Sequence, residues 1–198
     1  RMTLLVPDEL NLSMDRDTSA PMLLTRPPAD DDHFSIETYL TVVNRKGVLP
    51  LGGYTGLIMM RDDLRAYVWW GAVFNTAVGG DRWDGRSLRS YGAKGARFDT
   101  SIGLRIEKRG AELLLFYRHD YDQEWREGDT PDEGMRGPDL PVAAYFEPGT
   151  YKVGVYVASG TKRVNVALDY FDSPELTRAR PVDGSAKAAV TWGRLKAD

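Results

Sequence analysis

Mainly apolar and mainly polar side chains alternate in the segment FSIETYLTV, residues 34–42. Successive side chains of a β-strand point to opposite faces, so a period of two indicates a strand with one buried face. The alternation therefore predicts a half-buried strand that starts near Phe34. The residues expected on its buried side are Phe34, Ile36, Thr38, Leu40 and Val42.

Further segments rich in β-branched and aromatic residues follow, separated by turn residues. Such runs favour strands, and none of them keeps a helical period over three turns. The fold class predicted is therefore all-β, with about ten or more antiparallel strands in a two-sheet β-sandwich or jelly roll. We interpret NTAVGGDRWDGRS, residues 75–87, as a loop. The segments expected to form strands are 54–61, 64–74, 88–93, 100–109, 111–119, 150–159 and 163–172.

The length of 198 residues favours one domain. We divide the chain into an irregular N-terminal segment packed on the sandwich (1–29), the β-sandwich (30–172), and a C-terminal linker or peripheral strand (173–198). An extra strand around Val190 and Trp192 is one alternative for that tail. The chain starts at Arg1 without an initiating methionine, so we expect it to belong to a longer parent protein.

Composition excludes several classes of function. The formal net charge of −3 argues against a nucleic-acid partner, because phosphate binding needs a basic face. The absence of cysteine excludes disulfides and thiolate metal sites, and two histidines are too few for an all-histidine zinc site. The longest apolar stretch, AYVWWGAVF, is about half of the roughly 20 residues that a membrane-spanning helix needs.

The order of several segments resembles a known family. These segments are HFSIETYLTV, YTGLIMMRDDLRAYVWWG, GLRIEKRGAELLLFYRHDYDQEW, YKVGVYVAS and VNVALDYFD. Together they are similar to the regulation-of-enolase-like family of uncharacterised domains, which resembles the C-terminal β-sandwich domain of bacterial xylosidases. The resemblance covers about residues 30–172 and implies the concanavalin A-like lectin/glucanase fold. In such domains a turn after the LLLFY strand returns a tryptophan to the sheet, and Tyr117 and Trp125 match that frame.

Aromatic residues make a glycan-binding surface the leading interpretation. Tyr67 and Trp69 share one face of a predicted strand, and Trp70 lies on the other. Trp83 falls in the predicted loop with Asp81, Asp84 and Arg86, which we expect to form a ligand rim. The alternative is that these aromatics fill the core. A ligand platform requires at least two of the four residues Trp69, Trp70, Trp83 and Trp125 in one concavity.

The stretch FYRHDYDQEW, residues 116–125, supplies the remaining candidates, His119, Asp122 and Trp125. Retaining glycosidases need two carboxylates about 5 Å apart. Asp120, Asp122 and Glu124 have the period of a strand face, but they fall in a predicted turn. The alternative is a structural turn in which the aspartates bind backbone amides and Trp125 is buried. We therefore predict no catalytic residue.

The function predicted is a non-catalytic carbohydrate-recognition or accessory module of a larger bacterial protein. A structural or protein-interaction sandwich without a ligand is the alternative, and a weak glycoside hydrolase is the third reading. The expected partners are a carbohydrate and the rest of the parent protein, at a secreted or cell-surface location rather than in the cytoplasm. No cofactor is predicted, and the metal content stays open because ADDDH, residues 29–33, has a Ca²⁺-binding loop as its alternative interpretation.

Overall fold

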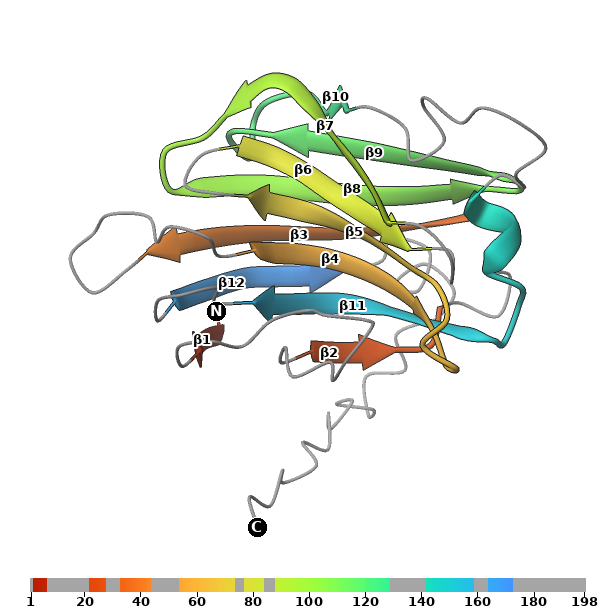
Figure 1. Cartoon of the computed structure of the whole chain (residues 1–198). Coiled ribbons are helices and arrows are strands. Elements are labelled where there is room, and N and C mark those ends of the chain that lie inside the picture. The colour runs from red at the N-terminus through yellow and green to blue at the C-terminus, as the bar shows by residue number, and fades with distance from the viewer. Residues whose placement is uncertain are drawn as a thin grey trace, which may run out of the picture.

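The chain is seen in a computed structural model, which describes residues 2–6, 22–27, 33–43, 54–73, 77–83, 88–128, 142–158 and 164–172. In these residues two antiparallel β-sheets of six strands each lie face to face (Figure 1). The prediction of an all-β, two-sheet antiparallel sandwich is thereby confirmed. No helix in the described part of the chain has the length and apolar character needed to cross a bilayer.

The first sheet joins strands from the two ends of the chain with strands from its middle. Its neighbours are antiparallel throughout. In spatial order its strands are β1 (Met2–Val6), β12 (Val164–Asp172), β3 (His33–Val43), β8 (Ser101–Arg109), β9 (Glu112–Arg118) and β10 (Arg126–Glu127).

The second sheet is built mainly from a meander of four consecutive strands. A single turn of 3-10 helix, η1 (Val142–Tyr145), precedes β11. In spatial order the strands are β2 (Met22–Thr25), β11 (Tyr151–Ala158), β4 (Tyr54–Arg61), β5 (Tyr67–Val73), β6 (Ala77–Trp83) and β7 (Leu88–Arg97).

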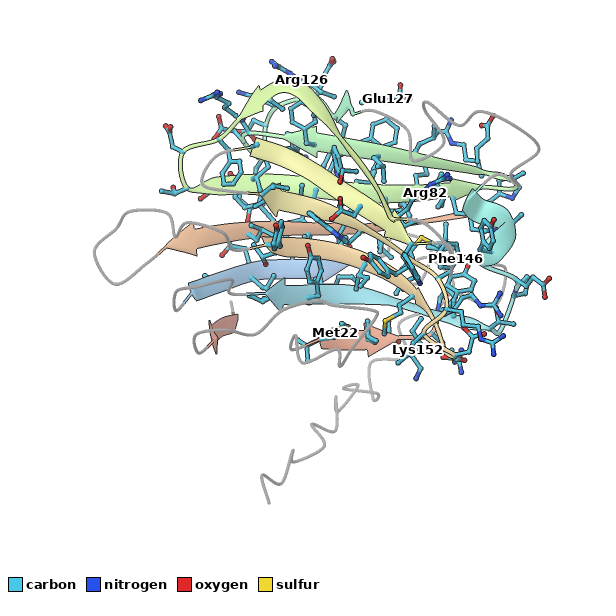
Figure 2. All side chains as sticks on the ribbon, viewed as in Figure 1. Met22, Arg82, Arg126, Glu127, Phe146 and Lys152 are labelled. Atoms are coloured by element: carbon cyan, nitrogen blue, oxygen red, sulfur yellow. The ribbon has the colours of Figure 1, made fainter. Side chains whose placement is uncertain are left out.

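The core lies between the sheets and follows the alternation of the sequence. Ile36 and Leu40 of β3 face Leu57 and Met59 of β4 within one cluster of buried side chains. Trp70 joins this cluster, and its indole Nε1 donates a hydrogen bond to the carbonyl of Phe116 in the opposite sheet at 2.8 Å. Side chains of both sheets fill the space between them (Figure 2).

The structure corrects the sequence-based expectations at two places. Residues 1–29, expected to be irregular, contribute β1 and β2 to the two sheets. The predicted loop 75–87 contains β6, whose glycines had suggested a loop although they pair in register with β5 and β7. The two last strands are neighbours in sequence, yet β11 belongs to the second sheet and β12 to the first. The tail with Val190 and Trp192 lies outside the described residues.

Candidate functional site

The outer face of the second sheet, which points away from the first sheet, carries an apolar layer of its own. Its buried members are Ile58, Met60, Tyr67, Trp69 and Tyr156. The paired tryptophans therefore divide as expected, with Trp69 on the outer face and Trp70 in the core. Trp69 is nevertheless only 3% exposed, so this face differs from the wet outer surface of a simple two-sheet sandwich.

A row of four glycines crosses this sheet. Gly56 pairs with Gly71, Gly71 pairs with Gly79, and Gly79 pairs with Gly92, so the row runs from β4 to β7. A Cβ atom on Gly71 would lie 2.1 Å from the carbonyl oxygen of Thr55. Only glycine fits there, and the row lacks the side chains that would otherwise cover the sheet.

Side chains on both sides of this row enclose a cavity of about 280 Å³, which we call the sheet-face pocket. Its floor is formed at Gly79 and Gly80, and the small side chain of Ala77 is exposed at its rim. Its lining also includes the side chains of Tyr54, Trp69, Asp81 and Ser90.

Asp81 is the charged group of the sheet-face pocket. Its carboxylate accepts hydrogen bonds from the side chains of Ser90 and Trp69. Burial nevertheless raises the pKa of Asp81, and the two hydrogen bonds act in the opposite direction. The pKa of Tyr54 is also raised, by burial first and by the negative charge of Asp81 second. A fixed carboxylate beside a phenol suits the recognition of ligand hydroxyl groups.

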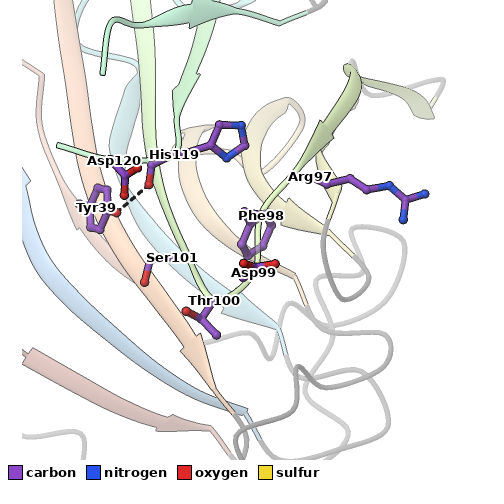
Figure 3. A pocket seen from close by; sticks show the side chains of 8 residues that line it. All are labelled: Tyr39, Arg97, Phe98, Asp99, Thr100, Ser101, His119 and Asp120. Atoms are coloured by element: carbon purple, nitrogen blue, oxygen red, sulfur yellow. Dashed lines mark hydrogen bonds between the residues drawn. The ribbon is translucent and has the colours of Figure 1, made fainter. Parts of the chain in front are cut away.

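A second cavity, of about 670 Å³, lies beside the turn after β9 and is called the turn pocket (Figure 3). The Tyr39 hydroxyl donates a hydrogen bond to the carbonyl of His119 at 2.8 Å, which fixes one wall. Figure 3 shows Arg97 extending away from the other side chains. The rings of Tyr39 and Phe98 in its lining are both buried, and the imidazole of His119 is half-buried.

The turn itself, residues 119–125, is attached to the outer face of the first sheet. The Tyr121 hydroxyl donates to Asp169 at 2.8 Å, and Arg118 donates to the Tyr121 carbonyl and the Tyr170 hydroxyl. A register shift in β12 between Leu168 and Tyr170 accompanies these contacts. Trp125 packs against the guanidinium groups of two arginines. Its ring centroid lies 4.9 Å from the Cζ atom of Arg105 and 4.3 Å from the Cζ atom of Arg118.

The predicted ligand-binding residues therefore fall into separate places. Tyr67, Trp69 and Trp83 share the outer face of the second sheet. Trp70 is fully buried, which corrects the expectation that it lies on a binding surface. The remaining three lie on the other side of the sandwich: His119 lines the turn pocket, Asp122 is exposed in the turn, and Trp125 packs between the arginines.

Neither cavity is lined by two of the four tryptophans that the sequence singled out. Instead, the sheet-face pocket combines Trp69 with Tyr54, Asp81 and Ser90. Asp81 was singled out with the expected ligand rim, whereas Tyr54 and Ser90 were not, and Asp84 and Arg86 lie outside the described residues. The periodicity of YTGLIMMR places Tyr54 on the same face as Ile58 and was the signal available for it.

The acidic residues of the turn do not form a buried catalytic pair. Asp120, Asp122 and Glu124 are all exposed, and the Asp120 carboxylate accepts a hydrogen bond from the Gln123 side chain at 3.2 Å. Within the described ranges, no group of three or more His, Asp or Glu side chains is arranged to hold a metal ion. Apart from His33, the acidic segment 29–33 lies outside those ranges.

Comparison with solved structures relates the fold to proteins that act on carbohydrates. The GH43 protein BlXynB from Bacillus licheniformis matches 86% of this chain with a TM-score of 0.64 and 12% identity, and 32% of that chain is covered. The xylan beta-1,4-xylosidase from Bacillus halodurans matches 81% of this chain with a TM-score of 0.53 and 13% identity, and 34% of that chain is covered. This chain thus spans about a third of the length of these two enzymes.

A functionally unknown protein from Saccharomyces cerevisiae matches 86% of this chain and 85% of its own, with a TM-score of 0.56 and 13% identity. Identities this low show a shared fold. No family model matches the sequence, and no curated protein matches it either. The expected likeness to xylosidases is therefore confirmed for the fold, while membership of the regulation-of-enolase-like family stays a prediction.

Proposed function

We propose that this chain is a non-catalytic carbohydrate-recognition module and that the sheet-face pocket is its binding site. The observation that carries the proposal is the Asp81 carboxylate, fixed by Trp69 and Ser90 beside a glycine floor. Sugars present hydroxyl donors around an apolar ring. A preformed acceptor next to a phenol ring and a floor without side chains complements both features.

Each side chain has a distinct part in this proposal. Tyr54 is half-buried and presents an aromatic surface to the sugar, while Asp81 and Ser90 bind its hydroxyl groups. Trp69 is too deeply buried to stack on a ligand, so its contribution is to hold the Asp81 carboxylate in place. The turn pocket is less suited to this task, because the rings of Tyr39 and Phe98 in its lining are buried.

The fold supports the same assignment. Two six-stranded antiparallel sheets and the likeness to GH43 proteins favour the concanavalin A-like lectin/glucanase architecture. One protein of similar structure is a xylan beta-1,4-xylosidase, so xylo-oligosaccharides are the first ligands to try. The proposed accessory role is consistent with the match of this chain to about a third of the length of these two proteins.

The direct test is a substitution that fills the sheet-face pocket and leaves its floor at Gly79 and Gly80 unchanged. Ala77→Tyr places a large side chain at the exposed rim of the sheet-face pocket, and Ala111→Tyr places the same side chain in the distant turn between β8 and β9. The wild-type chain should bind a glycan on an array and in calorimetric titration with xylotriose. Binding should be lost in Ala77→Tyr and kept in Ala111→Tyr. Equal binding by both variants would place the glycan elsewhere.

A further inference from the structure

The glycine row is closed at one end by aromatic rings. Tyr54 and Ile58 are four residues apart on β4, which corresponds to about 13 Å along a strand, and Ile58 pairs with Trp69. The ring centroids of Tyr54 and Trp69 are nevertheless only 5.4 Å apart. The two rings therefore lean toward each other across the row, above Gly56 and Gly71, which are both buried.

A third ring extends this closure toward β11. Tyr156 lies opposite Gly56 in the register of β11 and β4, and its ring centroid is 5.5 Å from that of Trp69. Tyr156 is itself buried, with 1% of its surface exposed. A ligand that lies along the row therefore meets a wall where the row passes from β6 to β5.

The opposite end of the row has small residues. Gly92 and Ser90 belong to β7, where Gly92 is half-buried and Ser90 is exposed, whereas Ala77, exposed at the rim, belongs to β6 and pairs with Arg97 of β7. Exposure thus increases along the row from β5 to β7. Among the residues that the structure describes, the sheet-face pocket is a blind cleft, closed on the β4 side and accessible from the β7 side.

We propose that the sheet-face pocket binds the terminal sugar of a glycan chain and does not accept an internal segment. This inference rests on the proposed carbohydrate-binding function and specifies its ligand. A chain that passed through would need two open ends, whereas this cleft has one. Its volume of about 280 Å³ lies just below the roughly 300–1,000 Å³ of sites for drug-sized ligands, and it suits a single ring.

Asp81 can also distinguish a terminal sugar from an internal one. A carboxylate has about four lone-pair positions, and Trp69 and Ser90 donate to it here. The remaining capacity can accept hydrogen bonds from sugar hydroxyls. A terminal unit carries a free hydroxyl where an internal unit carries a glycosidic bond. The carboxylate can therefore bind a group that only the end of a chain possesses.

Chain length provides the test. The wild-type chain is titrated with linear xylo-, cello-, laminari- and manno-oligosaccharides of two to six units, at equal concentrations of chains. A terminal-sugar site predicts dissociation constants within about twofold from the dimer to the hexamer of the bound series, since one subsite supplies the contacts. An increase in affinity of about tenfold or more with length would overturn the inference, because it requires additional subsites.

A variant that opens the closed end strengthens the test. Tyr54→Ala removes one of the rings that close the row, and circular dichroism checks that the variant is folded. If the sandwich is intact, this variant should bind every oligosaccharide more weakly, because it also loses the ring that contacts the sugar, and its remaining affinity should become dependent on chain length. If the affinity of the wild type depends on chain length and Ala77→Tyr abolishes binding, the proposed function would stand and only the terminal-sugar site would be overturned. Absence of binding in all four series would overturn both proposals.

Discussion

The ring of Tyr121 stacks on the ring of Tyr39, with centroids 3.9 Å apart and an interplanar angle of 23°. Tyr39 belongs to β3, whereas Tyr121 belongs to the turn after β9. The stack and the hydrogen bond from Tyr121 to Asp169 attach this turn to the outer face of the first sheet. The acidic segment that resembled a catalytic hairpin is thus held as a structural element.

Replacing Tyr121 should loosen this attachment. Tyr121→Ala removes an aromatic pair and a hydrogen bond to a carboxylate from a side chain that is 46% exposed. We expect a loss of about 1–2 kcal/mol in the free energy of unfolding, measured by urea denaturation. Tyr121→Phe keeps the ring and should lose less than half of this. Equal losses in the two variants would show that stacking contributes nothing.

The same tyrosine predicts instability at alkaline pH. Burial and the hydrogen bond to Asp169 raise the pKa of Tyr121 above its ordinary value of 10.0. Above pH 10 the unfolded chain therefore loses this proton more readily than the folded chain, and stability falls as pH rises. Urea midpoints measured from pH 8 to pH 11 should fall more steeply for the wild type than for Tyr121→Phe. Parallel curves would contradict the attribution to Tyr121.

Trp125 should act on stability and not on binding. Its ring packs between Arg105 and Arg118, and Arg105 is also paired with Glu37. Trp125→Ala is expected to cost about 2 kcal/mol of unfolding free energy through lost packing and cation–π contacts. Glycan binding should be unchanged, because Trp125 is absent from the lining of the sheet-face pocket. The exposed neighbour Arg126 provides the control, Arg126→Ala, with little effect on either measurement. Loss of binding without loss of stability would return Trp125 to the ligand site.

Sequence patterns predicted the sandwich well because they reflect burial on one face of a strand. The alternation around Ile36 and Leu40 gave the correct inward face. The burial of Arg82 and Lys108 could not be predicted in this way. Both are buried at inward positions, which the polar character of their side chains argues against. Such exceptions depend on contacts made in the folded chain and have no signature in local periodicity.

The candidate site was harder to predict for a related reason. GGDRW reads as a loop, because glycine is usually depleted in strands. Gly79 belongs instead to a row of glycines contributed by four strands, and this row becomes visible only when the register is known. The sequence identified Trp69 and Asp81 separately. Their hydrogen bond depends on the pairing of β5 with β6.

Asp81→Asn should separate binding from stability. Because burial raises the pKa of Asp81, the folded chain bears a cost for holding this carboxylate charged at neutral pH. The amide removes the charge and can still accept a hydrogen bond from Trp69. The urea midpoint at pH 7 should therefore stay equal or rise, while glycan affinity falls about tenfold or more. As pH falls toward 3.8, the ordinary pKa of an aspartate, protonation of Asp81 should stabilise the folded wild type. The difference between the urea midpoints of the wild type and the variant should therefore become smaller. A large loss of stability at pH 7 would instead give Asp81 a structural role.

A methyl group added to the glycine row should affect stability differently at Gly71 and at Gly92. A Cβ on Gly71 would lie 2.1 Å from the Thr55 carbonyl oxygen, a backbone atom that cannot move without shifting β4. A Cβ on Gly92 would lie 3.3 Å from the Val78 carbonyl oxygen, where a small adjustment suffices. Gly71→Ala should therefore lower the free energy of unfolding by about 3 kcal/mol, whereas Gly92→Ala should change it by less than about 1 kcal/mol. Urea denaturation of the two variants measures the difference. Equal tolerance at both positions would mean that the strands are not held as close as the register requires, and the blind end of the cleft would lose its structural basis.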